Sequence, residues 1–96
     1  MFSQQARWDR RMPGDGHQKW EHAEVFCRFS GGKIVPLRFV VGAGSAATVV
    51  VSKVNYAWTE RQGKVTLHLF SVSDSRDTYR LCFDPEAMSW QVSSLQ

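Results

Sequence analysis

The sequence holds one residue pair that could do nucleophilic chemistry, a thiol with an imidazole. His68 and Cys82 fall in two neighbouring strand-like segments, and an imidazole beside a thiol can lower its pKa and make it a nucleophile. No residue is identifiable that would orient His68 or stabilise an oxyanion, and a buried Cys82 would be inert. We therefore expect no catalytic residue and a noncatalytic protein.

Metal and cofactor sites are also not indicated. His17 and His22 lie five residues apart, a spacing that suits neither one face of a helix nor one face of a strand, and no pair of cysteines accompanies them. The segment Gly42–Ala47 is rich in small residues, but it lacks the GK[ST] ending and the following helix of a phosphate-binding loop. The sequence predicts no metal and no cofactor.

A third group of residues combines aromatic and basic side chains, which small β-barrels use to stack bases or grip peptides. Between residues 33 and 80 there are seven Lys/Arg against three acidic residues, an excess that could attract phosphate. The nucleic-acid-binding residues predicted from this excess are Arg61, Lys64 and Arg80. Ordinary solvated strand faces are the alternative interpretation of these charges. The aromatic and basic group comprises Tyr56, Trp58, Arg61, Lys64, Phe70, Arg80 and Trp90.

These side chains must be positioned by strands, because residues 23–92 show five or six short segments with a period of two. In the clearest case, Lys64 to Phe83, apolar and polar residues alternate on either side of a polar turn. Ser30–Lys33 and Asp84–Ala87 carry turn residues. Pro36 cannot donate a ladder hydrogen bond, so its strand is expected to lie at an edge or to carry a bulge.

Two segments leave alternatives open. Residues 17–26 fit either a short helix or the start of a strand, and a strand from about Ala23 is preferred because Val and Phe dominate it. Thr48 to Trp58 is the longest strand candidate, and its three consecutive valines indicate burial on both faces or a bulge.

Residues 1–22 are expected to form a flexible arm, which carries an Arg–Trp–Asp–Arg–Arg patch. Residues 23–94 are expected to form a single β-barrel domain.

The predicted fold is all-β, a five- to six-stranded antiparallel sheet closing into a small SH3-like or OB-like barrel. Closure is favoured because it removes exposed sheet edges. The expected core consists of Val25, Phe39, Val50, Val54, Trp58, Leu67, Leu69, Leu81, Phe83 and Trp90.

Size and composition limit the remaining possibilities. The chain has 96 residues, 43% of them hydrophobic, and a net charge of +3, which suits one globular domain with a real core. Cys27 and Cys82 follow no apolar leader, so we expect reduced thiols and a cytoplasmic location. No apolar run approaches the length of a membrane span. We expect a monomer with no membrane partner.

From Lys33 onward the sequence resembles small bacterial β-barrel domains of unknown function. The resemblance rests on a skeleton of core positions, and it implies a compact barrel and transfers no site residue. Those positions are Pro36–Phe39, Val51–Val54, Trp58, Tyr79–Asp84 and Trp90–Val92.

The functional expectation is a noncatalytic binding or accessory domain. Nucleic acid is the sharper hypothesis for its partner. The alternative is a protein–protein interaction module that takes a partner strand at the edge Ile34–Val41 or uses the loop Gly42–Ala47.

Overall fold

Seven β-strands make up most of the described part of the chain. The computed structural model describes residues 19–41 and 47–95, and no helix occurs in these ranges. Residues 21–26 are in a strand, which decides between the two alternatives over that part of the segment. The strands are β1 (Glu21–Ser30), β2 (Lys33–Val41), β3 (Thr48–Val50), β4 (Lys53–Gln62), β5 (Val65–Ser73), β6 (Thr78–Asp84) and β7 (Ser89–Leu95).

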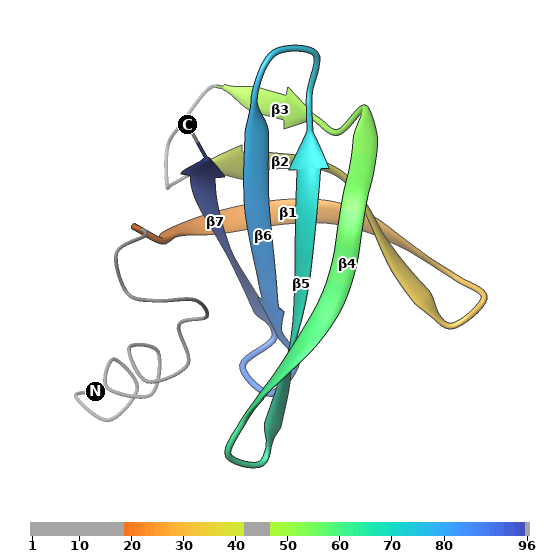
Figure 1. The fold of residues 1–96 in the computed structure, drawn as a ribbon, viewed down its shortest axis with the longest axis vertical. Coiled ribbons are helices and arrows are strands. Elements are labelled where there is room, and N and C mark those ends of the chain that lie inside the picture. Colours follow the sequence, from red (N-terminus) through yellow and green to blue (C-terminus); the bar gives the residue numbers. More distant parts are fainter. Residues whose placement is uncertain (1–18, 42–46, 96) are drawn as a thin grey trace.

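The strands form one curled antiparallel sheet in the order β3-β2-β1-β7-β6-β5-β4. β1 and β2 cross behind β4–β7, so that the sheet makes a half-barrel (Figure 1). The all-β antiparallel prediction is confirmed at this level. Because the order of the sheet ends at β3 and β4, these two strands are its edges.

The predicted long strand from Thr48 is divided into β3 and β4 by a bend at Val51 and Ser52. The backbone N–H of Val51 donates to the carbonyl oxygen of Leu37 (2.9 Å), and that of Ser52 donates to Ser73 (2.8 Å). One end of the bend is thus bonded to β2 and the other to β5. These bonds join the two sheet edges at this corner of the half-barrel, and the division raises the number of strands above the expected five or six.

Pro36 lies beside an irregularity in β2, as the sequence predicted. Phe26 pairs with Arg38 and Cys27 pairs with Pro36, so Leu37 has no opposite residue in β1. A bulge lets the chain pass a residue that cannot donate a ladder hydrogen bond.

Two predicted turns have the expected chemistry. Gly31 and Gly32 take positive φ values of 57° and 77° between β1 and β2, a conformation that glycine adopts without steric cost. The carboxylate Oδ1 of Asp84 accepts hydrogen bonds from the backbone N–H of Glu86 (3.0 Å) and of Ala87 (3.2 Å). Asp84 is itself buried, so a carboxylate inside the protein holds the backbone of this turn.

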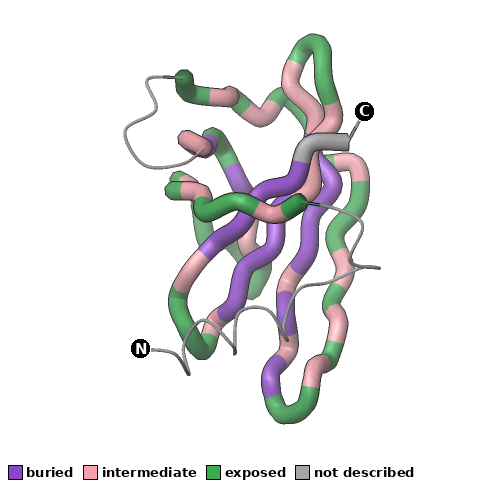
Figure 2. Tube along the Cα trace, turned by 90° about the vertical axis from the view of Figure 1, so that its left-hand side faces the viewer, coloured by how far each residue is buried: buried purple, intermediate pink, exposed green. Residues whose placement is uncertain are grey.

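Apolar side chains are buried on both faces of the sheet. The concave face, which lines the inside of the half-barrel, holds the larger cluster: Phe39, Phe70, Val72, Leu81, Phe83, Trp90 and Val92. The convex face holds a second cluster, with Trp20 and Trp58 packed against it: Val65, Leu67, Leu69 and Cys82. Figure 2 shows the buried stretches running side by side through the middle of the molecule.

The predicted core is right at its centre and wrong at its margin. Six of the ten expected side chains are buried, namely Phe39, Leu67, Leu69, Leu81, Phe83 and Trp90. Val25 packs against the concave cluster, and Trp58 against the convex cluster. Val50 is 62% exposed and Val54 is 37% exposed, because both belong to edge strands.

Candidate functional site

An apolar groove of about 540 Å³ opens on the concave side, between β4 and the start of β2. β4 contributes Val54, Ala57 and Thr59, and β5 contributes His68 and Phe70 behind them. The facing wall is the β1–β2 turn and the first residues of β2. The described residues that line it are Gly32, Lys33, Ile34, Val35, Val54, Ala57, Trp58, Thr59, His68 and Phe70. We call this space the groove.

The groove exists because two strand edges do not meet. In the part of the chain that the structure describes, β4 pairs only with β5. β3 pairs with Arg38, Phe39 and Val40 of β2, which leaves the stretch Lys33–Pro36 without a strand partner on that side among the described residues. The bend at Val51 and Ser52 joins the edges at one end, and the described lining reaches Gly32 and Lys33 at the β1–β2 turn.

An exposed aromatic residue lies next to the groove wall. Phe29 pairs with Ile34 across the β1–β2 hairpin, and paired residues of an antiparallel ladder share a face. The Phe29 side chain is 73% exposed. Aromatic side chains of this kind serve as anchors in protein interfaces.

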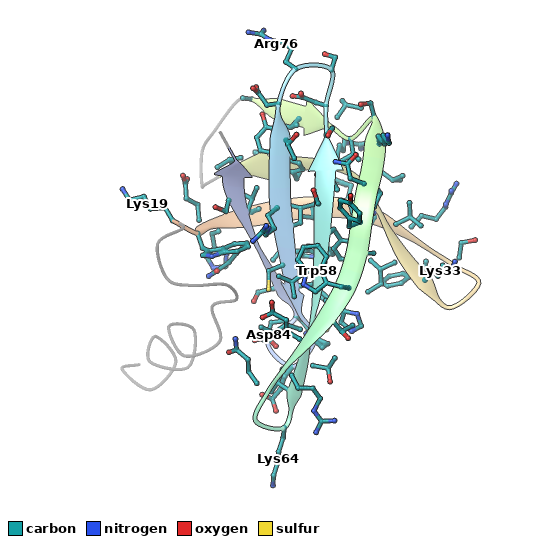
Figure 3. The ribbon with its side chains drawn as sticks, viewed as in Figure 1. Lys19, Lys33, Trp58, Lys64, Arg76 and Asp84 are labelled. Carbon is teal, nitrogen blue, oxygen red and sulfur yellow. The ribbon has the colours of Figure 1, made fainter. Side chains whose placement is uncertain are left out.

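The three basic residues proposed from the sequence do not converge. Arg61 pairs with Thr66, which lies two residues from His68 and therefore on the same face of β5. Arg61 is thus on the concave face, and its side chain is exposed. Lys64 lies at the tip of the β4–β5 hairpin (Figure 3). Arg80 pairs with Ser71, which puts it on the convex face with Leu69 and Cys82. The hypothesis that these three bind nucleic acid together stays a prediction.

Arg80 instead lies among aromatic residues of β4. Its guanidinium carbon is 5.6 Å from the centre of the Trp58 ring, and Ser71 pairs with both Arg80 and Tyr56. Beside them a shallow hollow of about 380 Å³ is lined by Lys53, Asn55, Tyr56, Ser71 and Thr78. Basic and aromatic side chains therefore do meet on the convex face, but around Arg80 alone of the three.

The thiol–imidazole pair is separated by the sheet. Cys82 pairs with Leu69, whereas His68 pairs with Phe83, so the two side chains lie on opposite faces. Burial, and then the nearby carboxylates of Asp84 and Glu60, raise the pKa of the Cys82 thiol to about 12. The sequence left open whether neighbouring strands bring His68 and Cys82 onto one face, and the register, which offsets the two residues by one position, places them on opposite faces.

The described ranges contain no group of three or more His, Cys, Asp or Glu side chains placed to hold a metal ion. They also contain no helix that is long and apolar enough to cross a membrane. The expected loop Gly42–Ala47 falls almost wholly outside the described residues, as do His17 and residues 1–18.

Comparison with protein-family models, with curated proteins and with solved structures gave no match. Sequence reasoning named the β2 side of the groove, but it missed Ala57, Thr59 and Phe29. The available signal was the mixed apolar and polar character of residues 53–62, which is typical of an edge strand.

Proposed function

We propose that this chain is a noncatalytic binding domain that takes an extended segment of a partner protein into the groove, where the segment pairs with β4. The observation that carries the proposal is the juxtaposition of an unpaired strand edge and an apolar groove. Backbone groups at a sheet edge supply affinity for an added strand, and pockets for alternate side chains supply selectivity.

The orientation of the added strand follows from the sheet. All strand pairs are antiparallel, so we expect the segment to run antiparallel to β4, starting near Arg61 and ending near Val54. Alternate side chains of the segment would then point toward Ala57 and Phe70. The open side of the half-barrel would gain one strand, which brings it closer to the closed barrel proposed from the sequence.

This proposal develops the protein–protein alternative in preference to nucleic acid. Nucleic-acid binding draws on a cluster of cations that track a backbone, and the three cations named for that role lie on two faces and a hairpin tip. Lys19, Lys33, Lys64 and Arg76 likewise project from four different parts of the molecule (Figure 3).

The test is an NMR titration with a short peptide of alternating threonine and valine. We expect amide shifts in β2 near Lys33–Val35 and in β4 near Ala57–Arg61. The same peptide N-methylated at alternate amides should bind much more weakly, because it cannot donate to a strand edge. No shift with either peptide would overturn the proposal.

A pair of variants controls for the face of β4. Ala57→Glu places a charge in the groove and should abolish binding, whereas Tyr56→Glu changes the neighbouring residue on the convex face and should leave binding intact. A second matched pair is Phe29→Ala and Tyr56→Ala, which truncate aromatic side chains of 73% and 72% exposure. Of these two variants, only Phe29→Ala should bind the peptide more weakly. Shifts produced by a single-stranded oligonucleotide around Arg80 would favour the nucleic-acid hypothesis instead.

A further inference from the structure

The formal charge on the groove lining is positive. Lys33 carries it, and none of the described residues that line the groove is acidic. Arg61 lies on the same face of β4 as Thr59, roughly 7 Å further along the strand. Lys33 of the β1–β2 hairpin therefore lines the groove, and Arg61 lies on the concave face beyond Thr59, the last residue of β4 in the described lining.

The acidic residues nearest in sequence are turned away or lie elsewhere. Glu60 pairs with Leu67, which puts it on the convex face, behind the strand that forms the groove wall. Asp74 belongs to the β5–β6 turn, where its carboxylate accepts hydrogen bonds from the backbone N–H of Arg76 (2.7 Å) and Asp77 (2.6 Å). Asp84 is buried in the β6–β7 turn.

From this arrangement we infer that the preferred occupant of the groove is an acidic apolar segment: an extended peptide whose first residues are Asp or Glu and whose following residues alternate with apolar side chains. The inference rests on the proposed strand addition. An antiparallel segment enters at Arg61, so its acidic residues must stand at its amino-terminal end to lie beside Arg61, and Lys33 adds a positive charge to the groove lining itself. The apolar residues that follow would contact Ala57, Ile34 and Phe70.

A peptide suits this site better than a polyphosphate chain. The lining beyond Lys33 is largely apolar, with Ile34, Val35, Val54, Ala57 and Phe70, and a charge on every repeat of a nucleic acid would be desolvated there without a partner. Two carboxylates followed by apolar side chains match both the charged end and the apolar interior of the groove.

The experiment compares three peptides that share the threonine–valine core and are titrated into the whole chain. One begins with two glutamates, one ends with two glutamates, and one begins with two lysines. We expect the first to bind most tightly, with about two- to fivefold in affinity from each charge pair, and its advantage to shrink as salt rises.

Charge reversal locates the effect. Lys33→Glu and Arg61→Glu should each remove the preference for leading glutamates, and the double variant should prefer leading lysines. Arg76→Glu is the matched control, because Arg76 lies at the opposite end of the molecule from Lys64 (Figure 3), and the preference should survive it. All variants are exposed substitutions, and the dispersion of their amide spectra reports that they are folded.

The outcomes distinguish the charge preference from the proposed strand addition on which it rests. If the three peptides bind equally well at the groove, the charge preference is overturned and the strand-addition function stands. If leading and trailing glutamates are equivalent, the proposed direction is overturned. If no peptide binds, both proposals fall. A single-stranded oligonucleotide that outcompetes the acidic peptide at Lys33 and Arg61 would overturn the choice of peptide as ligand.

Discussion

β4 and β5 are hydrogen-bonded neighbours along their whole length, yet they differ strongly in burial. Six of the nine residues of β5 are buried, whereas none of the ten residues of β4 is. β5 has a strand on each side and a cluster on each face. β4 has one strand partner, and its concave face borders the groove. The buried side chains of β5 therefore contribute to the stability of the fold, whereas we assign partner recognition to the exposed edge of β4.

Truncating one side chain on each strand gives the largest contrast. Leu69 is fully buried in the convex cluster, so Leu69→Ala should lower the free energy of unfolding by about 3–4 kcal/mol through lost burial and a cavity. Tyr56→Ala on β4 should change it by less than about 0.5 kcal/mol. Urea denaturation of both variants measures this, and equal losses would remove the distinction between the strands.

Alkaline pH probes the convex cluster through Cys82. Burial raises the pKa of its thiol from 9.0 to about 12, so the unfolded chain loses this proton at a lower pH than the folded chain. The stability that Cys82 contributes is therefore complete below pH 9 and is lost as pH rises toward 12. We expect a slope of about 1.4 kcal/mol per pH unit, or roughly 2–3 kcal/mol by pH 11.

The matching measurement is the unfolding free energy of the wild type and of Cys82→Ala across this pH range. The wild type should fall more steeply above pH 9, while the two curves run parallel below it. Alkylation at neutral pH should also be slower at Cys82 than at free cysteine. Parallel curves throughout would mean that the thiol is not shielded from water.

Trp58 is the residue of β4 that should behave like a residue of β5. It packs against the convex cluster and contacts Arg80, so Trp58→Ala should cost about 1–2 kcal/mol, between the values for Leu69 and Tyr56. Thermal unfolding followed by circular dichroism would measure this. A loss as small as that of Tyr56→Ala would show that this side of β4 adds nothing to the fold.

A small but measurable effect is expected at the bulge in β4. Asn55 lies where the register shifts between Val54 and Tyr56, and its Nδ2 donates to Ser73 Oγ over 2.9 Å. Removing this bond in Asn55→Ala should cost about 0.5–1 kcal/mol. Asn55→Asp keeps the shape of the side chain but not the donor, and should lose a similar amount. Denaturant midpoints compared at one protein concentration would resolve both changes.

The sequence predicted local structural features correctly where the side chain or the backbone of one residue determines the nearby conformation. The alternation of β5, the glycines of the β1–β2 turn, the role of Asp84 and the bulge beside Pro36 all follow from steric and hydrogen-bonding properties of single residues. These features are confirmed because a period of two and a missing N–H have the same consequence in any surroundings.

What the sequence could not determine is which strands stay unpaired. Leu67 and Leu69 belong to the convex cluster, whereas Phe70 and Val72 belong to the concave one, so β5 buries side chains on both faces. His68 and Cys82 are separated, and Arg61 is parted from Arg80, by the register of β5 against its neighbours. The groove itself lies between β4 and the first residues of β2, which do not pair with each other in the described part of the chain. Register and edge exposure are set by the packing of segments far apart in the chain, so only the tertiary structure decides where this protein can bind.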